Sequence, residues 1–307
     1  SDTTVRNAAL LALSGTARPE NRALYFNLLE NAPAEDIPAI QSAVMASLYG
    51  LGPEEQCTVL TAQLQKSAPS VQQRYYGLLA QTGTYPAVEL LAGIYLGMED
   101  FTSYMALINQ WNAPGEQKLL YLRKALDLAK DPKSTAALLR EISATNTFLG
   151  IMVSGPYMES PHNEVALAAA LSVYQLASRN KHFYGPGVSA FMEQAIPILE
   201  KAGYPDSVYD IQNIRKYLNE ANPNDGFTPL FNGKDLEGWK GLVGNPVSRS
   251  QMKPRDLEKA QKEADKLAFS QWIVEDGKLV FLGKEDNLCT KKDFGDFELY
   301  VDWLLYP

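Results

Sequence analysis

The last stretch of the chain, DFGDFELYVDWLLYP at residues 293–307, alternates between polar and apolar side chains with a period of two. This alternation predicts a β-strand that carries Glu298, Tyr300 and Asp302 on one face. On a solvent-facing sheet these groups would only favour solubility. On the concave face of a curved sandwich they could bind sugar hydroxyls or supply a carboxylate for acid/base catalysis, and the pattern leaves both roles open. The side chains predicted to face a core are Phe297, Leu299, Val301 and Trp303.

Trp239 is the side chain that could stack on a sugar ring, although its indole could instead be buried at the edge of a sandwich. A metal site has less support from the residue types than a sugar-binding or acid/base site. His162 and His182 are the only histidines of the chain, and their spacing fits neither the H-x-x-x-H nor the H-E-x-x-H pattern. The sequence therefore predicts no metal ligands and demands no cofactor.

The elements that would position these residues are short strands joined by turns. In QWIVEDGKLVFLG, residues 271–283, Asp276 and Gly277 predict a two-residue type I′ turn of a β-hairpin. Both faces of this hairpin are apolar, so we expect each to be covered, as in a sandwich. The predicted cross-strand pairs are Trp272 with Phe281, Ile273 with Val280, and Val274 with Leu279.

A charged helix is predicted between residues 254 and 269, after Trp239 and before the hairpin. Its apolar stripe is thin, and its remaining surface is rich in Lys and Glu. We interpret it as an insertion that lies against the edge of the β domain with its charged face in solvent, which requires no partner.

Residues 3–221 instead repeat a pattern of helix, short break and helix. Each break carries Pro or Gly beside a capping residue, as in NAPGE at 112–116, and the segments between them show one buried stripe at helical spacing. We therefore expect antiparallel helix pairs stacked as an all-α solenoid, and the opening VRNAALLALSG resembles one helix of a HEAT repeat. No fixed period is visible, so an irregular helical array is the alternative.

Length and charge limit the classes of function. The 307 residues suffice for two domains, and the net charge of −8 with a pI near 5.0 argues against nucleic acid as a partner. No apolar run reaches the roughly 20 residues that span a bilayer.

Cys57 and Cys289 lie far apart, and we expect both to be reduced. The chain starts without Met or a basic segment, so we expect any secretory signal to have been removed or left out.

The C-terminal part resembles the 3-keto-disaccharide hydrolase domain family, which has a concanavalin A-like jelly-roll fold. The stretch LFNGKDLEGW at 230–239 is similar to the opening signature of the family, and DGKLV, NLCTKKDFGDFEL and VDW follow in the family's order. The helical region also looks like the HEAT-like arrays that precede this domain in some secreted bacterial proteins. The resemblance thus implies a multidomain protein: a helical HEAT-like domain at 1–221, a linker at 222–226, and a sugar-processing jelly roll at 227–307.

In the family, the strand equivalent to ELYVDWLLYP is followed by a glycine-rich turn, an arginine and several more strands. A jelly roll needs roughly eight strands, and about four can be counted here. We therefore expect residues 227–307 to be the N-terminal part of the sandwich, incomplete at its C-terminus and unstable by itself or completed by another chain or fragment.

The resemblance implies an enzyme that hydrolyses or eliminates the glycosidic bond of 3-keto-disaccharides or other 3-keto-glycosides, with a carbohydrate as its substrate. Glu298 and Asp302 are then the candidate catalytic acids, and Trp239 and Tyr300 the candidate substrate-binding residues. A divalent metal is compatible with such chemistry but is not demanded by these residues. A periplasmic, secreted or cell-surface location follows from the same resemblance. The alternative is a non-catalytic carbohydrate-binding or protein-interaction module, in which the helical domain binds a protein partner.

Overall fold

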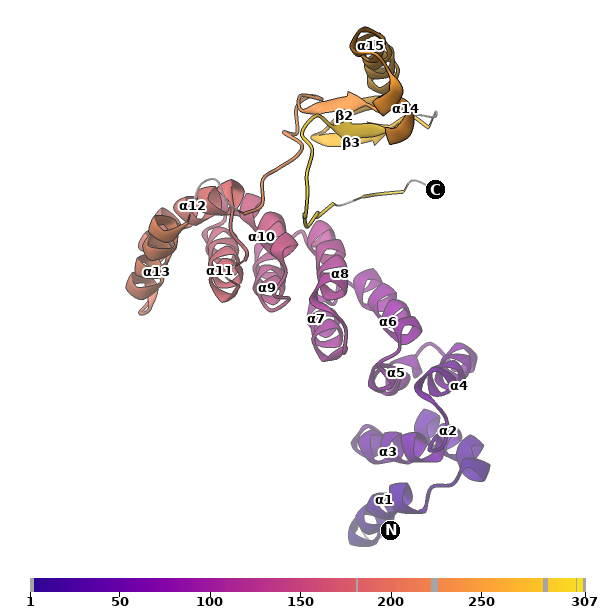
Figure 1. Ribbon diagram of the computed structural model, residues 1–307. Coiled ribbons are helices and arrows are strands. Elements are labelled where there is room, and N and C mark those ends of the chain that lie inside the picture. The colour runs from indigo at the N-terminus through magenta and orange to yellow at the C-terminus, as the bar shows by residue number, and fades with distance from the viewer. Residues whose placement is uncertain (1–2, 181, 222–225, 284–286, 302, 306–307) are drawn as a thin grey trace. The chain divides into compact units, whose positions relative to one another are not determined.

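The computed structural model describes residues 3–180, 182–221, 226–283, 287–301 and 303–305. The chain divides into two compact units (Figure 1). The first comprises Ser1–Lys181 and Phe191–Asn219, and the second comprises His182–Ala190 and Glu220–Pro307. Helices make up the first unit, whereas the second combines helices with short strands. The predicted change from helices to strands along the chain is therefore confirmed.

The helical region carries long α-helices separated by short connections, as the Pro and Gly breaks predict. Several start at a side-chain cap: Asp100 accepts a hydrogen bond from the Ser103 N–H at 3.0 Å, and Asp131 accepts one from the Ser134 N–H at 2.8 Å. Short 3₁₀ turns precede or follow some of the helices. The α-helices are α1 (Thr3–Thr16), α2 (Arg22–Asn31), α3 (Ile37–Ser47), α4 (Pro53–Lys66), α5 (Tyr76–Thr82), α6 (Tyr85–Gly97), α7 (Phe101–Gln110), α8 (Gly115–Leu128), α9 (Pro132–Ser143), α10 (Phe148–Ser154), α11 (Asn163–Arg179), α12 (Pro186–Ala202) and α13 (Ser207–Glu220).

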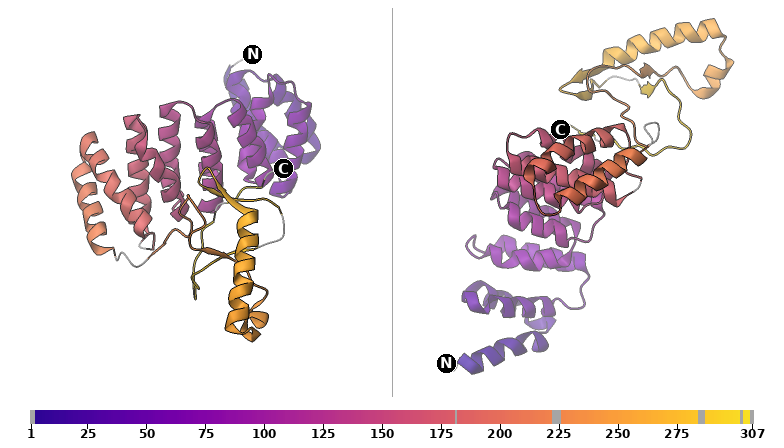
Figure 2. Two further views of the ribbon diagram at one scale, coloured as in Figure 1. Left: turned by 90° about the horizontal axis from the view of Figure 1, so that it is seen from above. Right: turned by 90° about the vertical axis from the view of Figure 1, so that its left-hand side faces the viewer.

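Most helices of the first unit lie beside the next one along the chain, whereas α1 packs on α3 (Figures 1 and 2). From α4 to α9, each helix packs on the next one along the chain, and α6 also contacts α4 and α8. A spacing that the sequence did not reveal is visible in this arrangement. Helices α2, α4, α6, α8 and α10 begin at residues 22, 53, 85, 115 and 148, which gives intervals of 30 to 33 residues. From α2 to α10 the array is therefore built from helix pairs of nearly constant length, whereas α12 begins 38 residues after α10.

The same hydrogen-bond pattern occurs at two corners of the array, the connection from α5 to α6 and the connection from α9 to α10. In each corner a buried threonine bonds the carbonyl three residues before it, the next residue has a positive φ, and a second buried threonine caps the following helix. The two hydroxyl groups are also hydrogen-bonded, at 3.3 Å in one corner and 3.0 Å in the other. The residues are Thr82, Gly83 and Thr84 in the first corner, and Thr145, Asn146 and Thr147 in the second.

The second unit contains two antiparallel sheets of two strands each among its described residues. The hairpin of β2 and β3 has the predicted register in all three apolar pairs. Its turn residues Asp276 and Gly277 have φ values of 48° and 71°, as a type I′ turn requires. The elements are β1 (Trp239–Gly241), α14 (Pro246–Gln251), α15 (Pro254–Gln271), β2 (Trp272–Glu275), β3 (Lys278–Phe281) and β4 (Leu288–Thr290), with β1 paired to β4.

The predicted charged helix is present as α15, and it packs on β1. The expectation that both faces of the hairpin are covered is not met, because Ile273 is 38% and Phe281 45% exposed. Within the part of the chain that the structure describes, no further sheet lies over these two side chains.

The strand predicted at residues 297–303 is absent from the described residues of this segment. Phe297, Leu299, Val301 and Trp303 are each more than half exposed, so the expectation that they face a core is wrong for this structure. The physical reason is that a strand forms only against a neighbouring strand, and no described segment pairs with this one. The linker expected at 222–226 falls, for residues 222–225, outside the described residues.

Among the described residues, none of the helices combines the length and the apolar character that a membrane span needs.

Candidate functional site

Two of the four candidate residues are in contact. The hydroxyl of Tyr300 donates a hydrogen bond to Oε1 of Glu298 at 2.7 Å. Tyr300 is partly buried because its ring packs edge-on against Phe227, with 5.0 Å between the ring centroids and 66° between the ring planes. Glu298 itself is exposed. The ring contact fixes the phenol, and the phenol in turn holds one carboxylate oxygen, so Glu298 is oriented although its backbone is irregular.

The third candidate, Asp302, lies outside the described residues, so its position relative to Glu298 stays a prediction.

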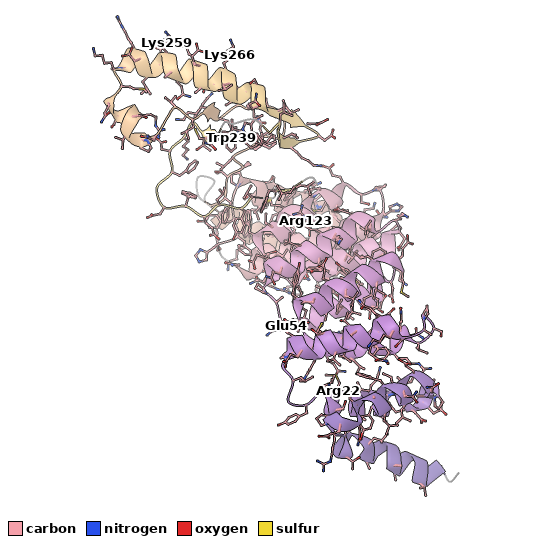
Figure 3. The ribbon with its side chains drawn as sticks, turned by 90° about the vertical axis from the view of Figure 1, so that its right-hand side faces the viewer. Arg22, Glu54, Arg123, Trp239, Lys259 and Lys266 are labelled. Carbon is pink, nitrogen blue, oxygen red and sulfur yellow. The ribbon has the colours of Figure 1, made fainter. Side chains whose placement is uncertain are left out.

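The fourth candidate, Trp239, lies on the first strand of the second unit (Figure 3). It is opposite Thr290 of β4, and its indole is partly buried. The indole Nε1 is a buried donor that has no hydrogen-bond partner among the described residues. No described hydrogen bond or ring contact joins Trp239 to Glu298. The structure therefore brings Glu298 and Tyr300 into contact, and among the described residues it shows no direct contact between Trp239 and that pair.

Trp239 is positioned by a tight loop that the sequence pattern suggested only as a turn. Oδ1 of Asn232 accepts hydrogen bonds from the N–H groups of Lys234 and Asp235 at 2.8 and 3.0 Å. The amide Nδ2 of Asn232 donates to Oδ1 of Asp235 at 2.8 Å, and the Glu237 N–H donates to the same oxygen at 2.9 Å. The hydrogen bond from Asn232 holds the pKa of Asp235 below its usual value. The Asn-Gly-x-Asp spacing at residues 232–235 is the sequence signal that indicates this loop.

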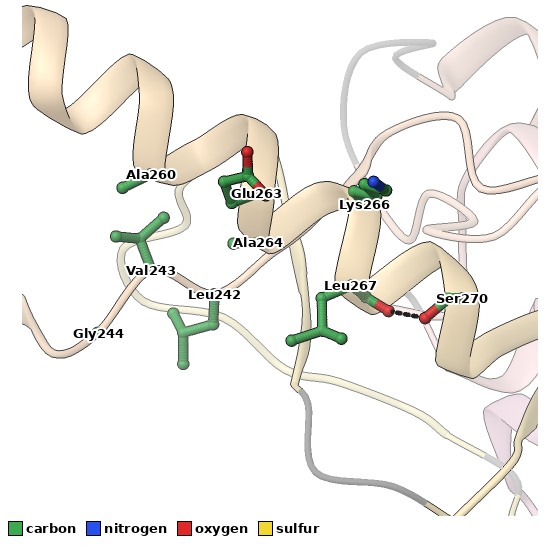
Figure 4. Close-up of a pocket in the computed structure, with 9 residues that line it drawn as sticks. All are labelled: Leu242, Val243, Gly244, Ala260, Glu263, Ala264, Lys266, Leu267 and Ser270. Carbon is green, nitrogen blue, oxygen red and sulfur yellow. Dashed lines mark hydrogen bonds between the residues drawn. The ribbon is translucent and has the colours of Figure 1, made fainter.

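A shallow open groove of about 560 Å³ lies between α15 and the residues that follow β1 (Figure 4). Its floor is apolar, because Val243 is buried and Ala260 and Ala264 face it from the helix. Glu263 and Lys266 are the charged side chains at its border. None of the four candidate residues lines this groove, so it offers apolar contact and no carboxylate pair for acid/base chemistry.

Metal ligands and cysteines add no further site within the described part of the chain. Among those residues, no group of three or more His, Cys, Asp and Glu side chains could hold a metal ion. Both cysteines are free thiols. Cys57 is buried, and the thiol of Cys289 contacts the Lys240 carbonyl oxygen at 3.5 Å. These contacts are structural, as expected for thiols that lie far apart.

Comparison with known proteins gives one match, to a family model. No curated protein and no solved structure matches the chain. The match is with a family model and covers about a quarter of the sequence, which confirms the resemblance drawn from LFNGKDLEGW and the motifs after it. This match indicates a carbohydrate-related function. Residues 226–307 are similar to the 3-keto-alpha-glucoside-1,2-lyase-like domain.

Proposed function

We propose that residues 226–307 belong to a domain that cleaves the glycosidic bond of 3-keto-glycosides, such as 3-keto-disaccharides. The observation that carries this proposal is the family match over these residues. The oriented pair of Glu298 and Tyr300 supports it, because a carboxylate held by a phenol is a suitable group for proton transfer. Fold alone would not carry the assignment, since sandwich folds host many functions.

The chemistry follows from the ketone at C3 of the sugar. This ketone makes the hydrogen on C2 acidic, so a base can remove it and leave an enolate. The electron pair of the enolate then forms the double bond between C1 and C2, while the bond from C1 to the leaving oxygen breaks. The departing alkoxide takes up a proton. Addition of water to the unsaturated sugar would complete a net hydrolysis.

In this proposal the carboxylate of Glu298 removes the C2 proton, and the carboxyl group of Asp302 supplies the proton that the departing alkoxide takes up. The Tyr300 hydroxyl bonds one carboxylate oxygen, which leaves the other for the substrate. Trp239 provides an aromatic surface for a sugar ring. The chemistry leaves room for a divalent metal that would polarise the ketone, although no described ligand group requires one.

The wider architecture is part of the same proposal. We place residues 227–307 in a concanavalin A-like jelly roll, and the helical array in a solenoid that acts as a scaffold or binds a protein. The helix-pair interval of 30 to 33 residues is shorter than the roughly 40–47 residues of HEAT repeats, so it supports a solenoid of short helix pairs better than a HEAT array. A periplasmic, secreted or cell-surface location fits a protein that acts on external sugars.

The test is an NMR time course of a 3-keto-disaccharide with the full 307-residue chain, run with and without added divalent metal. We expect loss of the anomeric signal with the unaltered chain and at least about a hundredfold slower loss with Glu298→Gln, because general base catalysis contributes at least that factor. Glu275→Gln is the matched control, since Glu275 is an exposed glutamate on β2. An unchanged substrate, or equal rates for the two variants, would contradict the catalytic assignment.

A non-catalytic carbohydrate-binding module is the second candidate. The exposure of Glu298 favours it, because a solvent-exposed carboxylate can accept hydrogen bonds from sugar hydroxyls without being enclosed in a cleft with the substrate. Binding of the keto-sugar without turnover in the same NMR samples, with weaker binding by Glu298→Gln, would identify this function.

A further inference from the structure

A cluster of aromatic side chains and one carboxylate lies on α6, α7 and α8, in the unit that the proposed chemistry does not use. Its members, which we call the aromatic cluster, are Tyr85, Glu89, Trp111 and Tyr121. Tyr85 and Glu89 lie one turn apart on α6, Trp111 is the C-cap residue that follows α7, and Tyr121 lies on α8. Three consecutive helices of the array therefore contribute to one surface.

The cluster is held rigidly by packing. The Trp111 ring is only 6% exposed, and it meets the Tyr121 ring edge-on with 5.4 Å between the centroids. The hydroxyl of Tyr104 donates to the Tyr121 backbone carbonyl at 2.8 Å, which ties α7 to α8. The Tyr121 hydroxyl donates a hydrogen bond to Oε2 of Glu89, which ties α8 to α6. Binding at this surface would thus cost little conformational entropy.

One ring of the cluster is presented to solvent. Tyr85 is 59% exposed, although its ring centroid lies 6.3 Å from that of Trp111. It is the first residue of α6, and the capping hydroxyl of Thr84 fixes that helix end. An exposed aromatic ring supported from below by a buried indole gives a flat apolar platform.

Polar groups remain available beside this platform. Oε1 of Glu89 accepts no hydrogen bond from the described residues, and the carboxylate is exposed. The indole N–H of Trp111, on a side chain that is 94% buried, likewise has no hydrogen-bond partner among them. Burial, together with Glu89 and the Tyr85 hydroxyl, raises the pKa of Tyr121, so its phenol stays protonated and continues to donate to Glu89 at neutral pH. The surface therefore offers a free acceptor and a free donor next to a flat ring.

We propose that the aromatic cluster is a binding site for a neutral saccharide. The ring of Tyr85 stacks on the apolar face of a pyranose, Glu89 accepts hydrogen bonds from its hydroxyl groups, and the Trp111 N–H donates to a sugar oxygen.

The negative charge of Glu89 disfavours anionic ligands. A cationic ligand fits less well, because the three rings pack against one another rather than surround a cavity, and only Tyr85 presents a largely exposed ring. The site is independent of the chemistry proposed for residues 226–307, and it would hold a glycan chain on the helical array.

Isothermal titration of the full 307-residue chain with cellohexaose and with maltohexaose tests this site. We expect at least one of them to bind with a dissociation constant of about 1 mM or tighter, and Tyr85→Ala to weaken this binding about tenfold. Glu89→Gln keeps the shape of the carboxylate and should weaken binding severalfold. Tyr49→Ala is the matched control, because Tyr49 is 86% exposed and lies outside the cluster. It should bind as the unaltered chain does.

The proposal is overturned if neither oligosaccharide binds the unaltered chain, or if Tyr85→Ala binds as tightly as Tyr49→Ala. Binding of tetramethylammonium ion that competes with the sugars and is lost in Tyr85→Ala would identify a cation site instead, and would also overturn it. Helical circular dichroism of each variant confirms that it is folded. Tyr85→Ala should cleave the 3-keto-disaccharide at the same rate as the unaltered chain, which separates this site from the proposed catalytic one.

Discussion

The backbone N–H of Gly241 donates a hydrogen bond to Oδ1 of Asp265 at 2.9 Å. One turn earlier on the same helix, Nε2 of Gln261 donates to the Gly241 carbonyl oxygen at 2.8 Å and to Asp265 at 2.7 Å. Two side chains of α15 thus satisfy both backbone groups of Gly241 on β1. Because an unpaired strand edge invites pairing with other chains, α15 protects this edge. The charged helix that the sequence marks as an insertion is therefore a structural cover of the small sheet.

The first prediction concerns the close approach at Gly241. A Cβ atom there would lie 2.2 Å from the backbone carbonyl oxygen of Ala264, which cannot move without displacing α15. Gly241→Ala should therefore destabilise the second unit by about 1–3 kcal/mol. Peptide-resolved hydrogen exchange should show faster exchange in β1 and α15. Gly93→Ala, in open space on α6, is the control and should leave both elements unchanged. Unchanged exchange in Gly241→Ala would contradict the close contact.

The second prediction concerns the repeated threonine corners. Thr147 is almost fully buried, caps α10 through the Gly150 N–H at 3.1 Å, and bonds Thr145 at 3.0 Å. Thr147→Ala should lower the free energy of unfolding by about 1–2 kcal/mol, because it removes the cap and one partner of a buried hydroxyl. Thr147→Ser retains the hydroxyl and should lose less. Urea titrations followed by helical circular dichroism measure both, and equal losses would show that the methyl group matters more than the cap.

The third prediction concerns acid stability at Glu30. Its Oε1 accepts hydrogen bonds from the Ser67 hydroxyl at 2.5 Å, the Gln63 amide at 2.9 Å and the Tyr75 hydroxyl at 3.0 Å. The bond from Ser67 is the main cause that holds the pKa of Glu30 below the usual 4.5, while burial raises the pKa of Tyr75 to about 12. Because the folded pKa of Glu30 is depressed, its stabilisation is complete above the unfolded pKa and is lost as the pH falls from about 4.5 through the folded value.

The measurement for Glu30 is a series of urea titrations between pH 7 and pH 3. The unaltered chain should lose stability below about pH 4.5, and Glu30→Gln should show a smaller loss over that range. Glu116→Gln, an exposed glutamate on α8, serves as the control and should follow the unaltered chain. Parallel curves for Glu30→Gln and the unaltered chain would show that another group carries the acid sensitivity.

Local patterns predicted more of this structure than long-range ones. The register of β2 and β3 was predictable because the Asp276-Gly277 turn fixes which residues face each other. Helix boundaries were predictable from Pro, Gly and capping residues for the same local reason. The strand at 297–303 was not, since its alternation gives no information on whether a partner strand is present.

The helix-pair interval and the contacts at the candidate site could not be predicted from the sequence, for different reasons. Thr82 and Thr145 lie in equivalent corners, but their neighbours Gly83 and Asn146 differ in type and share only a positive φ, which the sequence does not display. The bond between Tyr300 and Glu298 follows from two residues on one predicted face. The ring contact that fixes Tyr300 involves Phe227, more than 70 residues earlier, and no local pattern indicates such a pair.

The last prediction separates backbone strain from steric contact in the hairpin turn. A Cβ atom at Gly277 would have only Gly233 O within contact distance, at 3.9 Å, so space is available for alanine. The φ of 71° is nevertheless costly for a residue with a Cβ atom, and Gly277→Ala should destabilise the hairpin by about 1–2 kcal/mol. Asp276→Asn at the neighbouring position, with φ 48°, should change stability by less than about 0.5 kcal/mol, because asparagine adopts this conformation as readily as aspartate. Hydrogen exchange of β2 and β3 distinguishes the two variants. The amides of β2 and β3 could instead be as well protected from exchange in Gly277→Ala as in Asp276→Asn. In that case the turn in solution is not of type I′, and the cross-strand pair of Trp272 and Phe281 must be held by packing alone.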